Sequence, residues 1–147
     1  MTASRAYPDR PYLAVSAAVI RGDQVLVVRR ARPPARGFYS LPGGVVEAGE
    51  TLFEAAIREV REETGAAIEP VALAGHREVI SRDAAGRVDR HFVIFCFAAR
   101  WLSGEPSSSE EAAETLWLRP GELAARRTTE GLADIVAAAF ERINAKP

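Results

Sequence analysis

The segment from Val88 to Ala98 constrains the fold more than any other part of the sequence. It reads as one strand, in which successive side chains point to opposite faces. Apolar residues occupy both faces, so both must be covered by other parts of the chain. We therefore predict a sheet with an element packed on each side. One face carries Phe92, Ile94 and Cys96, and the other carries Val93, Phe95 and Phe97.

The other segments supply a hairpin, further strands and two helices. Gly22-Asp23 has turn chemistry and lies between two β-rich apolar runs, which indicates a hairpin. Residues Glu50 to Thr64 contain no helix breaker and are followed by Gly65, as is typical of a helix and its C-terminal glycine. We predict an α/β fold, with a mixed sheet between helices. The expected segments are strands at Leu13–Ile20, Gln24–Arg29, Ile68–Leu73, Arg77–Ile80 and Thr115–Leu118, a turn at Asp83–Gly86, and a second helix from about Thr129 to Asn144.

Size and composition limit the class of protein. A chain of 147 residues, 48% hydrophobic and 27% charged, fits one globular domain over residues 1–147. The longest apolar run, Phe92 to Ala99, is shorter than the roughly 20 residues of a membrane helix. The formal net charge of −1 gives no general attraction for nucleic acid. The single cysteine, Cys96, fits a reducing compartment, and we expect a cytoplasmic protein.

Three carboxylates share one face of the Glu50–Thr64 helix. Glu59, Glu62 and Glu63 fall on an arc beside the apolar face. Like charges at these spacings destabilise a helix by roughly 0.2 to 0.5 kcal/mol per pair, so a purely structural helix gains nothing from them. Clustered carboxylate oxygens suit Mg²⁺ better than Zn²⁺. The alternative is a solvated face neutralised by Arg58 and Arg61.

A long loop rich in helix and strand breakers precedes this helix. The stretch Ala31–Gly49 contains seven glycines and prolines, which leaves little regular structure. Loops of this length in compact domains are usually functional. Gly43 and Gly44 bring free backbone groups towards the start of the helix, where they can meet anions or metals.

Loop and helix together resemble the Nudix box. The matching residues are Gly44, then Glu50 after five residues, then, after seven more, Arg58-Glu59-Val60-Arg61-Glu62-Glu63-Thr64-Gly65-Ala66. Every defining glycine, glutamate and arginine is present at its spacing. The departure is Ala66, where the family prefers a larger aliphatic residue. The order of the flanking elements also resembles the Nudix α/β/α sandwich.

The resemblance implies hydrolysis of a nucleoside diphosphate linked to another group, with Mg²⁺ or Mn²⁺ as the cofactor. It implies that Glu62 and Glu63 bind metal, that Glu59 binds metal or acts as a base, and that Arg58 orients the acids. The carbonyl of Gly43 is implied as a further metal ligand, and Glu50 matches the remaining acid of the box.

Other candidate site residues lie outside the box. Nudix enzymes commonly supply an additional acid from the loop that matches the one before Trp117, and the resemblance therefore implies Glu111 as an acid for the metal or the attacking water; a solvated loop is the alternative. Arg29 and Arg30 end a strand and could hold phosphate, or serve only solubility. Phe38 could frame a base or ribose, although packing explains such an aromatic residue equally well. We count Gly44 with the substrate-binding residues.

The leading hypothesis is a Mg²⁺-dependent pyrophosphohydrolase acting on ADP-ribose or a similar small nucleotide. A nucleoside triphosphate pyrophosphatase is the second hypothesis, and a nucleotide-binding module without turnover is the third. Substrate choice should be encoded in the regions Arg82–Arg90 and Ser103–Glu114. We expect no nucleic-acid or membrane partner, and the resemblance is compatible with a homodimer.

Overall fold

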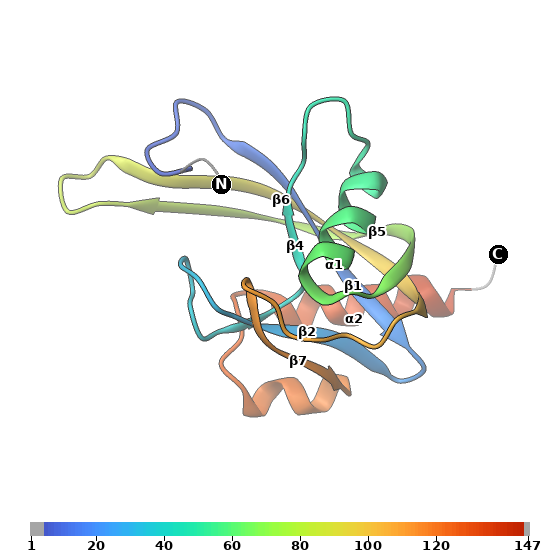
Figure 1. Cartoon of the computed structure of the whole chain (residues 1–147). Helices are drawn as coiled ribbons and strands as arrows, with labels where there is room; N and C mark the ends of the chain where they lie inside the picture. Colours follow the sequence, from blue (N-terminus) through green and yellow to red (C-terminus); the bar gives the residue numbers. More distant parts are fainter. Residues whose placement is uncertain (1–4, 146–147) are drawn as a thin grey trace.

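The structure is a computed structural model and describes residues 5–145. Figure 1 shows a central set of strands with helices around it. The strands are β1 (Tyr12–Arg21), β2 (Gln24–Arg30), β3 (Tyr39–Ser40), β4 (Gly43–Val45), β5 (Ala67–Arg82), β6 (Val88–Ser103) and β7 (Ala112–Leu118). The helices are α1 (Leu52–Thr64), the short 3₁₀ helix η1 (Pro120–Ala125) and α2 (Leu132–Asn144).

The sheet is mixed, with β1 at its centre. β1 pairs in parallel with β6, from Tyr12 opposite Phe92 to Ile20 opposite Arg100. The other pairs between named strands are antiparallel: β1 with β2 and β4, β2 with β3 and β7, and β5 with β6. β1 and β2 pair only beside their turn, and β4 then takes the place next to β1. This arrangement brings the glycine-rich strand β4 against the middle of the sheet.

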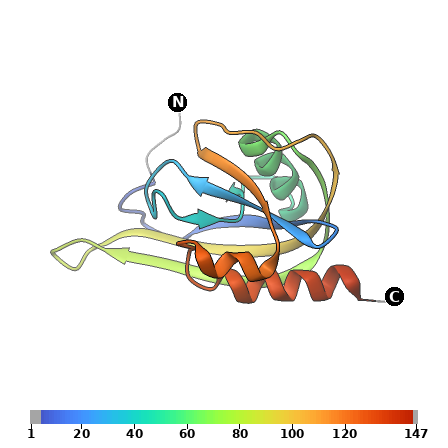
Figure 2. The same ribbon diagram turned by 90° about the horizontal axis from the view of Figure 1, so that it is seen from below.

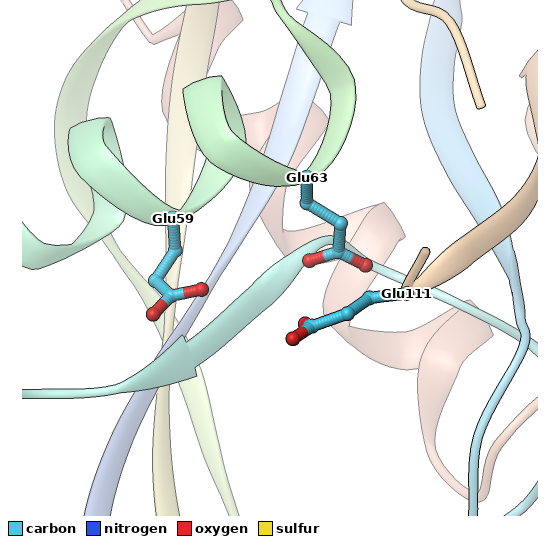
Figure 3. Close-up of side chains that lie close together, drawn as sticks. All are labelled: Glu59, Glu63 and Glu111. Carbon is cyan, nitrogen blue, oxygen red and sulfur yellow. The ribbon is translucent and has the colours of Figure 1, made fainter. Parts of the chain in front are cut away.

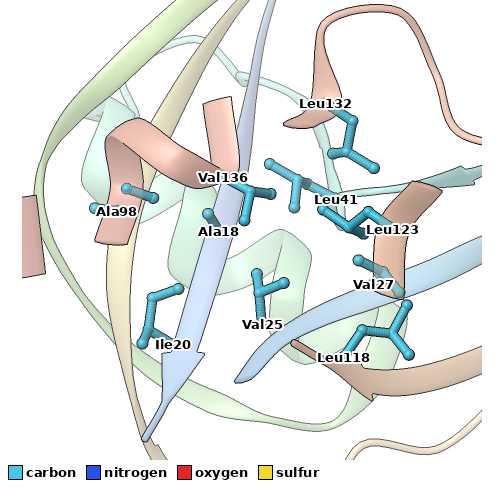
Figure 4. Packing of buried hydrophobic residues seen from close by; sticks show 11 residues of the cluster. Ala18, Ile20, Val25, Val27, Leu41, Ala98, Leu118, Leu123, Leu132 and Val136 are labelled. Atoms are coloured by element: carbon cyan, nitrogen blue, oxygen red, sulfur yellow. The ribbon is translucent and has the colours of Figure 1, made fainter. Parts of the chain in front are cut away.

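The two long helices cover opposite faces of the sheet, as Figure 2 shows. On one face, α1 packs against Val15 and Phe97 through Ala55 and Ala56. On the other, α2 packs against Ala18 and the neighbouring strands in the apolar cluster of Figure 4. Because β1 alternates between the two layers, its Ala14–Ile20 stretch is buried throughout. The predicted mixed sheet between helices is confirmed.

Helix α1 begins two residues later than predicted. Thr51 caps it: the Thr51 hydroxyl accepts from the Glu54 N–H (3.1 Å), and the Glu54 carboxylate accepts from the Thr51 N–H (3.2 Å). This capping box is visible in the sequence and fixes the helix start. The helix ends as predicted at Gly65, whose φ of 84° lies in the left-handed region.

The β5–β6 hairpin differs most from the prediction. The two expected extended stretches, Ile68–Leu73 and Arg77–Ile80, form one continuous strand, because β6 pairs along its whole length. The hairpin reaches beyond both helices (Figure 1). The residues around Phe92 to Phe95 are therefore only partly buried, and full burial on both faces is confined to Cys96–Ala99.

Smaller differences between the predicted and observed elements arise from strand pairing that the sequence does not indicate. β6 continues past Ala98, because β5 pairs with it as far as Ser103. β7 begins at Ala112 rather than Thr115, because β2 pairs with it from there. The Ala31–Gly49 loop contains the short strands β3 and β4, and η1 was not predicted. Within residues 5–145, no helix is long and apolar enough to cross a membrane.

Candidate functional site

Three carboxylates from two parts of the chain converge at one end of α1. Glu59 and Glu63 are one helical turn apart on α1, and Glu111 lies directly before β7. One oxygen from each lies within 4.8 Å of the other two, and the three side chains face one another in Figure 3. Oxygen ligands at this density suit Mg²⁺ or Mn²⁺. The residues present therefore fit a divalent cation.

Glu63 is the buried member of this group. It is 7% exposed, and its Oε2 accepts a hydrogen bond from the Gly43 N–H at 3.0 Å. Burial raises the pKa of Glu63 to about 7, although the Gly43 N–H opposes that rise. The backbone of β4 thus fixes the direction of the Glu63 side chain.

Gly44 of β4 lies directly against the carboxylate of Glu59. A Cβ on Gly44 would lie 2.4 Å from the carboxylate carbon of Glu59, which is shorter than any ordinary contact. A glycine is therefore needed for the carboxylate to rest against β4. Burial also raises the pKa of Glu59, and its hydrogen bond from Arg58 acts in the opposite direction.

Arg58 holds the acids of this region in place. Its guanidinium donates two hydrogen bonds to Glu50 (2.6 and 2.9 Å) and one to Glu59 (2.7 Å). It also donates to the carbonyl of Val45 at 3.0 Å, which ties the helix to the end of β4. The Arg58 guanidinium lowers the pKa of Glu50 to about 2, and Glu50 in turn raises the pKa of Arg58. Arg58 thus connects Glu50, Glu59 and the end of β4, and its role in orienting the acids stays a prediction.

Glu62 occupies the rim of the site. Its side chain is 62% exposed and accepts a hydrogen bond from Arg58 at 3.2 Å. It lines a cavity of about 300 Å³ together with Glu59, Glu63 and Glu111, but it lies outside the group of three oxygens. Metal ligation by Glu62 and by the Gly43 carbonyl stays a prediction.

A larger cavity of about 380 Å³ adjoins the carboxylates, and Glu63 and Glu111 line both. It also contains Gly43, Gly44 and the predicted Arg30. Arg30 donates from Nε to the carbonyl of Pro34 at 2.7 Å, and burial lowers its pKa. The cavity runs along the α2 side of the sheet towards the β5–β6 hairpin.

Sequence reasoning missed some residues of this cavity, and two of its substrate-binding candidates, Arg29 and Phe38, do not line it. Arg77 and Arg90 line it, and only their position on a continuous β5–β6 hairpin could have revealed this. Arg29 does not line either cavity and instead lies 3.9 Å from Glu114 on the neighbouring strand. Phe38 is also elsewhere, beneath the guanidinium of Arg127.

A family model described as the NUDIX domain matches residues 10–139. The chain belongs to the Nudix hydrolase family. It is 34% identical over 104 residues to an ADP-ribose pyrophosphatase of Methanocaldococcus jannaschii, a match that spans 71% of this chain and 59% of that protein. It is 36% identical over 101 residues to an 8-oxo-dGDP phosphatase of Mus musculus, which covers 69% of this chain and 28% of the mouse protein. The chain therefore spans less than two thirds of either relative.

Solved structures agree with this assignment. The crystal structure of a MutT NUDIX hydrolase from Burkholderia pseudomallei superimposes with a TM-score of 0.75 and 28% sequence identity. The match covers 92% of this chain and 100% of that one. The α/β/α arrangement of this Nudix chain is therefore shared along nearly its whole length.

Proposed function

We propose that this Nudix protein is a Mg²⁺-dependent pyrophosphohydrolase that cleaves the diphosphate of a small nucleoside diphosphate derivative such as ADP-ribose. The observation that carries the proposal is the convergence of the Glu59, Glu63 and Glu111 carboxylates. The relative named as an ADP-ribose pyrophosphatase supports the choice of substrate. Mn²⁺ is the alternative cofactor, because it prefers the same oxygen ligands.

Glu59, Glu63 and Glu111 would hold the cation, with Glu62 at the rim. When bound, the cation supplies charge neutralisation for the phosphoryl oxygens and makes a coordinated water more acidic. Glu63 needs its fixed orientation to contribute, and the Gly43 N–H provides it. Arg58 does the same for Glu59 through the bond at 2.7 Å. These contacts restrict the carboxylates to one arrangement before substrate arrives.

Proton removal from the attacking water falls to a carboxylate of the same group. Glu111 is the exposed member and is accessible to water, whereas Glu63 is buried. Glu59 is half-buried and neutralised in part by Arg58. Glu111 is therefore our first choice for the general base, with Glu59 second.

A nucleoside triphosphate pyrophosphatase is the second candidate function. It is favoured by the arginines Arg30, Arg77 and Arg90 around the larger cavity, which suit a substrate with more negative charge. A nucleotide-binding module without turnover is the third, and the complete set of carboxylates argues against it.

Incubation of the protein with a panel of nucleotides and Mg²⁺, followed by chromatography, tests these functions. ADP-ribose cleavage releases AMP and ribose 5-phosphate, whereas triphosphate cleavage releases a nucleoside monophosphate and pyrophosphate. Loss of either activity in excess chelator, with recovery on adding Mg²⁺, is the expected result. Binding without any product would instead support the module without turnover.

We also propose that residues 1–147 act as one Nudix domain in the cytoplasm. The proposed partner is a small nucleotide rather than a nucleic acid or a membrane, in line with the formal net charge of −1. A homodimer is the proposed assembly, and light scattering across a range of protein concentrations tests it.

A further inference from the structure

Three arginines line the larger cavity. Arg30 comes from β2, Arg77 from β5 and Arg90 from β6, and all three are partly buried. Over residues 5–145, none of them forms an ion pair, and their one side-chain hydrogen bond joins Arg30 to the Pro34 carbonyl. Guanidinium groups usually bind carboxylate or phosphate at such positions. Glu63 and Glu111 line the same cavity and attract Arg30 electrostatically, so the positive charge that forms no ion pair among residues 5–145 is that of Arg77 and Arg90.

Register keeps this charge beyond the carboxylates rather than beside them. Gly43 of β4 lies opposite Ser16 of β1, and Ser16 lies opposite Cys96 of β6. Arg77 pairs with Ile94, one step further along the same face. Arg90 is four residues further along β6, which at about 3.3 Å per residue is roughly 13 Å between backbones. The arginines thus extend from the carboxylate end towards the hairpin.

An unpartnered hydroxyl lies in the wall of the same cavity. Ser40 is 6% exposed, and its Oγ has no hydrogen-bond partner among the described residues. A buried hydroxyl without a partner destabilises a protein, so such groups usually serve a ligand or water. Ser40 could donate to a phosphoryl or sugar oxygen there. Between these polar groups, Val79, Phe92 and Ile94 give the cavity an apolar floor.

We infer that Arg77 and Arg90 bind a phosphoryl group of the substrate that is additional to the cleaved diphosphate. The carboxylates and their cation account for the diphosphate, whereas the charges of Arg77 and Arg90 stay unneutralised unless the substrate carries a further negative group. The inference rests on the proposed function and narrows its substrate class. The extra group is either the third phosphate of a nucleoside triphosphate or a phosphate on a sugar of the diphosphate derivative.

Three substrates separate these cases. ADP-ribose has no further phosphoryl group, ADP-ribose 2′-phosphate has one on a sugar, and ATP has a third phosphate. We expect wild-type kcat/KM to be higher for at least one of the phosphorylated substrates than for ADP-ribose. Arg77→Gln and Arg90→Gln should each lower that kcat/KM by about 10- to 100-fold, mainly through KM, and leave ADP-ribose hydrolysis nearly unchanged. The affected substrate identifies the source of the phosphate.

Arg82→Gln is the matched control. It removes the same charge from the same strand as Arg77, but Arg82 is exposed, bonds the Gly86 carbonyl at 3.0 Å and does not line the cavity. It should leave all three kcat/KM values unchanged. Arg77→Lys should recover part of the loss in kcat/KM, because lysine keeps the charge but cannot form the bidentate hydrogen bonds of a guanidinium. Thermal melting of each variant shows that the fold is retained.

Equal losses for all three substrates would overturn the inference, because the arginines would then act on the diphosphate itself. Unchanged kinetics in Arg77→Gln and Arg90→Gln would overturn it as well. Failure of the proposed function gives a different result, namely no hydrolysis of any substrate by the wild-type protein with Mg²⁺. In that event, titration calorimetry with inorganic phosphate still tests the subsite: binding should be present in wild type and Arg82→Gln and lost in Arg77→Gln, and equal binding by all three would refute it.

Discussion

The contact between Gly44 and Glu59 allows an activity change to be separated from a stability change. In Gly44→Ala, the new Cβ would lie 2.4 Å from the Glu59 carboxylate carbon, whereas ordinary contact begins at 3.4 Å. The carboxylate must therefore move by about 1 Å from its place beside Glu63 and Glu111. A misplacement of about 1 Å at a reacting centre lowers rates by about 100-fold, or about 2.7 kcal/mol of activation free energy. We expect this loss in kcat, together with weaker Mg²⁺ binding.

Gly44→Ala should lower the activity without lowering the stability of the fold. The atoms that meet the new Cβ are the end of a flexible side chain, and Gly44 has no left-handed φ. Replacing glycine by alanine at such a position stabilises the fold by about 0.4 to 1 kcal/mol, because it restricts the unfolded chain. The melting temperature of Gly44→Ala should be equal to or above that of wild type.

Two neighbouring substitutions complete the test. In Gly43→Ala, the new Cβ would lie 2.1 Å from the carbonyl oxygen of Val15, so β1 and β4 must separate and the melting temperature should fall. In Gly121→Ala, nothing lies within 4 Å, and both activity and melting should stay the same. Normal kcat and Mg²⁺ affinity in Gly44→Ala, or melting as low as in Gly43→Ala, would refute the reasoning.

Three further predictions follow from the acids and Arg58. Glu59→Gln and Glu63→Gln should each lower kcat by about 100-fold or more at saturating Mg²⁺ while the fold is retained, and kinetics with the proposed substrate check this. Because burial raises the pKa of Glu63 to about 7 from 4.5, the metal-free protein should lose up to about 3 kcal/mol of unfolding free energy as pH rises through that range. Urea unfolding in chelator at several pH values measures it, and a slope that survives in Glu63→Gln contradicts the assignment. In Arg58→Lys, the lysine ammonium cannot hold Glu50 and Glu59 together. We therefore expect kcat to drop about 10-fold and the free energy of unfolding to fall by about 1 to 3 kcal/mol. Wild-type values for both quantities would show that the guanidinium does not position these acids.

The sequence predicted the site best where the functional residues lie within one regular element of secondary structure. The run from Arg58 to Gly65 combines helical spacing, paired acids and a terminal glycine, and each signal depends only on neighbours in the chain. The meeting of Glu59 and Glu63 could therefore be predicted from helical geometry alone. Their meeting with Glu111 depended on the family resemblance, because the loop contact is made by tertiary structure.

The rest of the site depends on strand pairing over long distances. Gly75 reads as an interruption of a strand, but it lies inside β5, where a side chain would meet Ile135 of α2 at 2.5 Å. With β5 divided at that point, Arg77 could not be assigned to any face. Ser40 lies in a loop rich in prolines and glycines, and no local pattern indicates that its hydroxyl is buried. The arginine-lined cavity was therefore not visible from the sequence.

The parallel pairing of β1 with β6 also determines the order in which the protein can fold. Tyr12 meets Phe92 only after a loop of about 80 residues has closed, and such non-local pairing is slow. β4 is closer to β1 in the chain, so it can pair earlier and support Glu63 through the Gly43 N–H. Glu111 follows β6 and is positioned when β7 joins β2. Until that step Glu59 and Glu63 lack Glu111, so tight cation binding during refolding should appear together with β7 docking, after α1 has formed.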